Sequence, residues 1–136
     1  MTFRHVSILT SLLLFSLAIG WMFAPEQMLT QWGVEYSNGA GLVSRRSAAF
    51  YLGFAIMFFM ARNTEHSVTR MALIKGIVAT CTVLILLAVY EVSVGHANKQ
   101  ILMAALIEAI LGLAFLYVWR TSSKKHNVIN HSRTHK

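Results

Sequence analysis

The chain has 136 residues, of which 56% are hydrophobic and 12% are charged, whereas soluble domains carry about 25% charged residues. This length corresponds to one domain. The formal net charge is +7, but the basic residues are divided among the ends of long apolar runs, their connections and the segment after the last run. They form no stripe on a polar fold, which excludes a nucleic-acid-binding protein. The composition predicts an integral membrane protein.

Four apolar runs are long enough to cross a bilayer. A hydrocarbon core of about 30 Å and a helical rise of about 1.5 Å per residue require about 20 apolar residues. The predicted transmembrane helices are residues 6–24, 42–61, 71–94 and 101–119. The first run resembles a signal peptide but continues through Trp21 to Phe23 without a cleavage pattern, so it is predicted to be retained. Residues 1–119 are therefore predicted to form an all-α, antiparallel bundle of four transmembrane helices.

The connections between these helices are short. Pro25 and Glu26 predict a short interfacial helix that ends near Trp32, because proline fits the first helical turn and a carboxylate complements the helix dipole. Gly33 is a typical helix stop. Since the second and third connections are only a few residues long, we expect helices two, three and four to be antiparallel neighbours. Residues 120–136 show no hydrophobic period and are predicted to be a disordered basic tail.

The distribution of lysine and arginine predicts the orientation. In a four-span chain one side of the membrane holds nine of these residues and the other holds three, namely Arg45, Arg46 and Lys99. Positive residues favour the cytoplasmic side, so both termini are predicted to be cytoplasmic. The nine are Arg4, Arg62, Arg70, Lys75, Arg120, Lys124, Lys125, Arg133 and Lys136.

Three ionisable residues lie within or beside the apolar runs and form a candidate polar cluster: Arg46, Glu91 and Glu108. A charge within a bilayer needs a partner, a wet cavity or a nearby interface. Glu108 shares a helical face with small residues such as Ala104 and Ala105, so it is predicted to point inward. An ion pair of Arg46 with Glu108 or Glu91 would satisfy both groups. This cluster either locks helix packing or forms a functional pocket.

Secondary candidates for this site are Arg45, Tyr51, Tyr90 and His96. On the second transmembrane helix, Ala49, Gly53 and Met57 share the face of Arg46, whereas Phe50, Phe54 and Phe58 are expected to meet lipid. The aromatic residues near the helix ends, Trp21, Trp32, Tyr36, Tyr117 and Trp119, are interpreted as interfacial anchors.

No common catalytic signature is present. The chain has no aspartate, one cysteine (Cys81), no glycine-rich phosphate loop and no nucleophile elbow. No catalytic residue, cofactor or metal site is predicted. The leading hypothesis is a non-enzymatic accessory subunit or a binder of a small lipophilic molecule. The alternative is a small proton-coupled transporter that uses Glu108. The expected partners are the lipid bilayer and either a lipophilic molecule or another membrane subunit, with a homodimer left open.

Several short stretches resemble a known group of proteins. These are Phe23-Ala24-Pro25-Glu26, Ser44-Arg45-Arg46-Ser47-Ala48-Ala49 and Met60-Ala61-Arg62-Asn63. With four short-looped spans, they make the chain similar to the small bacterial four-helix membrane proteins grouped as DoxX-like. The resemblance implies a left-handed four-helix bundle in a bacterial cytoplasmic membrane. Because that group includes subunits of quinone-linked oxidoreductase complexes, such a role is a further alternative by analogy.

Overall fold

A computed structural model describes residues 2–64 and 67–133 of the chain, and for residues 122–133 it describes the backbone alone. The helices in chain order are α1 (Phe3–Phe23), α2 (Pro25–Gln31), α3 (Asn38–Ala61), α4 (Val68–Ser93) and α5 (Ile101–Arg133). The described residues contain no β-strand. The all-helical fold class predicted from the sequence is confirmed.

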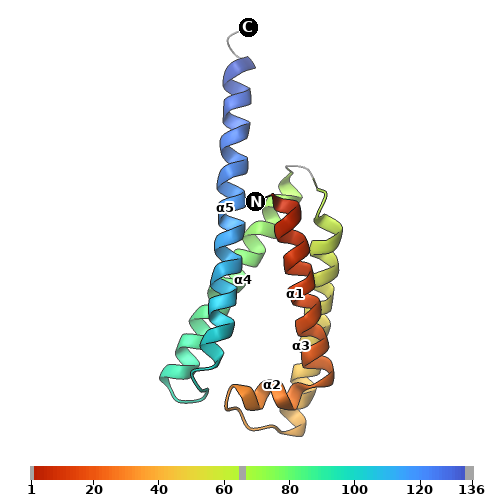
Figure 1. Cartoon of the computed structure of the whole chain (residues 1–136), viewed down its shortest axis with the longest axis vertical. Helices are drawn as coiled ribbons and strands as arrows, with labels where there is room; N and C mark the ends of the chain where they lie inside the picture. The colour runs from red at the N-terminus through yellow and green to blue at the C-terminus, as the bar shows by residue number, and fades with distance from the viewer. Residues whose placement is uncertain (1, 65–66, 134–136) are drawn as a thin grey trace.

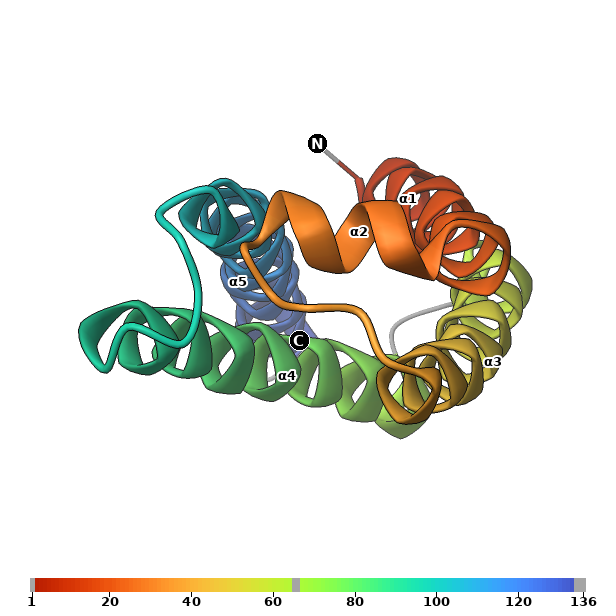
Figure 2. The same cartoon turned by 90° about the horizontal axis from the view of Figure 1, so that it is seen from below.

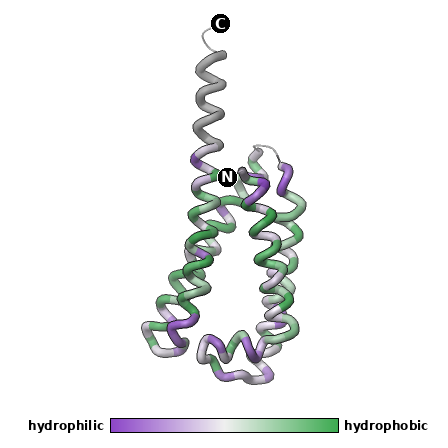
Figure 3. Tube along the Cα trace, viewed as in Figure 1, coloured by the Kyte–Doolittle hydropathy of each residue, from purple (hydrophilic) through white to green (hydrophobic). Residues whose placement is uncertain are grey.

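Four of these helices have the length and hydropathy of membrane spans: Phe3–Phe23, Asn38–Ala61, Val68–Ser93 and Ile101–Thr121. Hydrophobic residues run along all four, and hydrophilic residues gather in the connections (Figure 3). α2 has only seven residues and lies across one end of the bundle (Figure 1). The protein is therefore an all-α membrane protein with four transmembrane helices and a short helix in the first connection.

The first connection follows the predicted pattern. Pro25 occupies the first turn of α2 and Glu26 lies in the same turn. Gly33 has a φ of 76°, and its N–H donates a hydrogen bond to the Thr30 carbonyl at 2.9 Å. This left-handed conformation suits glycine, which confirms the predicted helix stop.

The helix boundaries differ from the prediction where serines cap the helices. α3 begins four residues earlier than expected because the Ala40 N–H donates to Ser37 Oγ at 3.1 Å. α4 begins three residues earlier than expected because the Arg70 N–H donates to Ser67 Oγ at 3.3 Å. Both caps satisfy backbone donors that a helix start otherwise leaves without a partner.

The disordered tail predicted from Arg120 is replaced by helix, since α5 continues as far as Arg133. Between Trp119 and Arg133 the sequence contains neither proline nor glycine, the residues that most strongly interrupt helices. The remaining part of the predicted tail, residues 134–136, lies outside the described residues.

The transmembrane helices pack as two pairs, α1 with α3 and α4 with α5. α3 and α4 make little contact with each other. The prediction that these two helices are packed neighbours is therefore wrong. Their connection holds the two ends together, but α4 runs away from α3 toward α5 (Figure 2). The predicted pairing of α4 with α5 is confirmed.

The two pairs meet in a hydrophobic core near the end of the bundle where the N-terminus lies, called here the N-terminal end (Figure 1). The Phe115 ring lies 5.4 Å from the Phe58 ring and 6.3 Å from the Phe3 ring, centroid to centroid. Ile74 of α4 joins the same core. The Arg70 guanidinium covers the Phe3 ring at 4.3 Å. These rings close the bundle at this end.

The buried face of α3 differs from the predicted one. Phe58 is only 2% exposed, whereas Arg46, Ala49, Gly53 and Met57 are exposed. α3 instead turns its small residues toward α1, where the buried Ser11 Oγ donates a hydrogen bond to the Ala55 carbonyl at 2.8 Å. Small residues allow the two helices to approach closely, and this interaction decides which face is buried.

Candidate binding cavity

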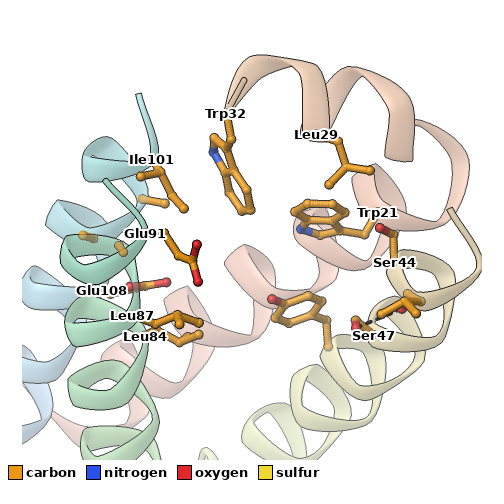
Figure 4. Close-up of a pocket in the computed structure, with 15 residues that line it drawn as sticks. Trp21, Leu29, Trp32, Ser44, Ser47, Leu84, Leu87, Glu91, Ile101 and Glu108 are labelled. Atoms are coloured by element: carbon orange, nitrogen blue, oxygen red, sulfur yellow. Dashed lines mark hydrogen bonds between the residues drawn. The ribbon is translucent and has the colours of Figure 1, made fainter. Parts of the chain in front are cut away.

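A cavity of about 240 Å³ lies at the opposite end of the bundle, called here the α2 end. Each of the five helices, or the residue that follows it, contributes to its wall (Figure 4). The lining residues are Trp21, Leu29, Trp32, Val43, Ser44, Ser47, Tyr51, Leu84, Leu87, Ala88, Glu91, Ile101, Ala104, Ala105 and Glu108. The wall is mostly apolar, with a small number of polar groups.

Two tryptophans and α2 cover one side of this cavity. The Trp21 and Trp32 rings lie 5.1 Å apart, centroid to centroid, with an angle of 58° between their planes. Trp21 is buried at the end of α1, and Trp32 follows α2 directly. Leu29 of α2 lies beside Trp21 (Figure 4). The first connection is therefore part of the cavity wall.

Asn98 attaches this cover to the second helix pair. Its backbone N–H donates to the Trp32 carbonyl at 2.7 Å, and its side-chain nitrogen donates to the Gln31 carbonyl at 3.0 Å. A Cβ atom at Gly33 would lie 3.3 Å from the Asn98 side chain, so the two segments are in close contact. Asn98 thus joins the α4–α5 connection to the segment that follows α2.

The two carboxylates of the predicted cluster both line the cavity, from the second helix pair (Figure 4). Glu108 shares the wall with Ala104 and Ala105, which confirms the inward face predicted for it. Glu91 Oε2 lies 3.0 Å from His96 Nδ1, and the His96 side chain is 69% exposed. Within residues 2–64 and 67–121, the structure gives the Glu108 carboxylate no ion pair.

Arg46 does not join this cluster. Its side chain is exposed, and it does not line the cavity. The predicted ion pair of Arg46 with Glu108 or Glu91 is therefore wrong. α3 presents Ser44, Ser47 and Tyr51 to the cavity, and a long arginine on the outer face of a helix can reach the membrane interface.

The secondary candidates separate in the same way. Tyr51 lines the cavity, and His96 reaches it only through its contact with Glu91. Arg45 and Tyr90 are exposed and lie outside the wall.

Sequence reasoning missed several residues of the wall. Trp21 and Trp32 were interpreted only as interfacial anchors, although both line the cavity. Ser44, Ser47 and Tyr51 were not recognised as one stripe, although spacings of three and four residues place side chains on one helical face. That polar stripe was the available signal. Asn98 gave no signal, because its contacts join segments far apart in the sequence.

The polar groups of the wall are carboxylates, hydroxyls and indole N–H groups. No group of three metal-ligating side chains occurs in the part of the chain that the structure describes. The hydroxyls of Ser44 and Ser47 donate to the carbonyls of Ala40 and Val43 on their own helix, at 2.8 and 3.0 Å. Their oxygens can still accept hydrogen bonds. The cavity thus combines aromatic rings, carboxylates and hydroxyl acceptors in an apolar wall.

Comparison with known proteins adds nothing to this description: no family model, curated protein or solved structure matches the chain.

Proposed function

We propose that this protein is a non-enzymatic membrane protein that binds a small lipophilic molecule in the cavity at the α2 end. The observation that carries the proposal is the cavity itself, which is concave, mostly apolar and lined by a few polar groups from all parts of the fold. Ligand sites in proteins have this composition and are frequently found between the helices of bundles.

The charge distribution supports an orientation for this site. Nine of the twelve lysines and arginines belong to the N-terminus, the α3–α4 region and the segment after Trp119, which are placed together by four crossings. We propose that this side is the cytoplasm of a bacterium and that the α2 end faces outward. The resemblance to DoxX-like proteins is in keeping with a bacterial inner membrane. A ligand would then enter from the outer leaflet or the space beyond it.

Tryptophan fluorescence provides a test of binding. The chain has three tryptophans, and in a Trp119→Phe background the two that remain both line the cavity. Bromobenzene, a heavy-atom quencher, should quench them with a saturable component in nanodiscs. Partition into lipid alone gives a linear response.

A matched pair of substitutions on α4 locates the site. Ala88 lines the cavity, whereas Ala79 lies outside the cavity on an exposed face of α4. Ala88→Leu should remove the saturable component, and Ala79→Leu should retain it. Ala104→Leu, which fills the cavity from α5, provides a second variant if Ala88→Leu does not fold. Saturable quenching that persists in a folded, cavity-filled variant would refute the proposal.

A second candidate function, a small proton-coupled transporter, is supported by one observation. Glu108 lines a cavity without an ion-pair partner among the described residues, and the aromatic core closes the opposite end of the bundle. A carrier needs a protonatable group that is reached from one side at a time. Proteoliposomes that move protons with a substrate, and that lose this activity in Glu108→Gln, would favour the transporter.

A further inference from the structure

The composition of the cavity also specifies a class of ligand. We infer that the cavity takes a small lipophilic cation, a quaternary or substituted ammonium group that carries an apolar substituent. This inference rests on the proposed function, because it assumes that the cavity binds a ligand.

The first argument is charge. Glu91 and Glu108 are the charged residues of the cavity wall, and the wall contains no lysine, arginine or histidine. Arg45 and Arg46, which are nearby in the sequence of α3, are exposed and lie outside the wall. Glu91 Oε2 contacts His96 Nδ1 at 3.0 Å, whereas Glu108 has no ion pair within residues 2–64 and 67–121. In a region of low dielectric constant, a carboxylate without a cationic partner creates a negative potential that attracts a cation and repels an anion.

The second argument is the balance of hydrogen-bonding groups. The hydroxyl hydrogens of Ser44 and Ser47 are already donated to carbonyls of α3. These serines therefore present oxygen acceptors to the cavity, as the carboxylates do. The remaining polar groups, the indole N–H of Trp21 and Trp32 and the phenol of Tyr51, are neutral. The wall therefore suits a positively charged ligand that carries few hydrogen-bond acceptors.

The third argument is the aromatic content. Trp21 and Trp32 line the side of the cavity that faces the two carboxylates (Figure 4), and Tyr51 of α3 is a third aromatic residue of the wall. Aromatic faces attract ammonium groups through their quadrupole, tryptophan most strongly, and aromatic cages are the usual receptors of quaternary ammonium ligands. The 5.1 Å separation of the two indoles places both within one small site.

Size and the aliphatic residues limit the ligand further. A volume of about 240 Å³ corresponds to about eight water molecules at liquid density. Leu29, Leu84, Leu87 and Ile101 supply apolar wall for the remainder of the ligand. A monocation with one small hydrocarbon group fits these limits.

A pair of isosteric probes tests the role of the charge. In 4-bromobenzyltrimethylammonium and 4-bromoneopentylbenzene, the same shape carries a quaternary nitrogen or a quaternary carbon. Quenching of Trp21 and Trp32 in the Trp119→Phe protein in nanodiscs, corrected with empty nanodiscs, gives an apparent affinity for each probe. We expect the cation to bind at least ten-fold more tightly than the neutral isostere.

Substitution of the carboxylates identifies their contribution. Glu108→Gln should weaken the cation at least ten-fold more than the neutral isostere, whereas the control Glu35→Gln, at an exposed position between α2 and α3 and outside the wall, should change neither. Glu91→Gln provides a second variant if Glu108→Gln does not fold.

Equal saturable binding of both probes, insensitive to Glu108→Gln and Glu91→Gln, would overturn the cationic assignment and leave the lipophilic site standing. If neither probe nor bromobenzene binds saturably to the folded protein, both the lipophilic site and its cationic ligand class are overturned.

Discussion

Glu108→Gln should stabilise the protein, because the structure gives this carboxylate no ion pair within the described residues. An acidic residue at the centre of a bilayer costs about 2.5 to 3.5 kcal/mol on insertion scales. Glu108 lies seven residues after Ile101, so it is about 10 Å from the end of its helix in a core of about 30 Å. Partial exposure to the cavity lowers the cost further. We estimate a gain of about 1 kcal/mol for the amide, on the order of one third of the central cost.

Thermal unfolding in lipid nanodiscs measures this gain. For a chain of this size, about 1 kcal/mol corresponds to a rise of about 3 to 5 °C in melting temperature. Glu35→Gln, which neutralises an exposed carboxylate outside the helices, should leave the melting temperature unchanged.

A fall of several degrees in Glu108→Gln would refute the reasoning, because loss of one member of a buried ion pair costs about 3 to 5 kcal/mol. Recovery of that loss in Arg46→Met combined with Glu108→Leu would show that the two residues are paired after all.

Other predictions concern the core, the cover of the cavity and the orientation. Phe115→Ala should lower the unfolding free energy by about 3 to 5 kcal/mol, measured by denaturation in detergent, because the ring is fully buried between two phenylalanines; a loss below 1 kcal/mol would place the core elsewhere. Asn98→Ala should increase backbone hydrogen exchange in residues 31–34, because the side-chain bond to Gln31 is lost; unchanged exchange would show that the backbone bond suffices. Reporter domains fused at the C-terminus and at Asn63 should both lie in the cytoplasm, and a periplasmic signal from either would contradict the proposed orientation.

Much of the fold follows from the sequence, because long apolar runs can be satisfied in lipid only as helices. The spans, the short helix after Pro25 and the glycine stop at Gly33 were all predictable from local chemistry. The early starts of α3 and α4 were also readable, since Ser37 and Ser67 are favoured caps.

The arrangement of the helices was not predictable in the same way. A short connection brings two helix ends together but does not fix the angle between the helices. For this reason α3 packs on α1 and diverges from α4. Apolar residues occur on every face of α3, so hydropathy alone did not show that Phe58 is buried and Arg46 exposed.

The candidate site was predictable in part. Glu91 and Glu108 were recognised because charge is rare in these runs and small or apolar residues share their helical faces. The aromatic side of the cavity was not recognised, because tryptophans near helix ends equally suit a membrane interface. Only the tertiary structure places Trp21 and Trp32 opposite the two carboxylates.

The most direct test of a solvent-reachable cavity at the α2 end compares two cysteine substitutions at similar depth on α5. In a Cys81→Ser background, Ala104→Cys would place a thiol in the cavity wall, and Leu106→Cys would place one on the exposed outer face. A cationic, membrane-impermeant methanethiosulfonate reagent added outside intact cells should modify position 104 rapidly and position 106 at least ten-fold more slowly. Equal modification of the two positions, or protection of position 104 from both sides of the membrane, would contradict the account.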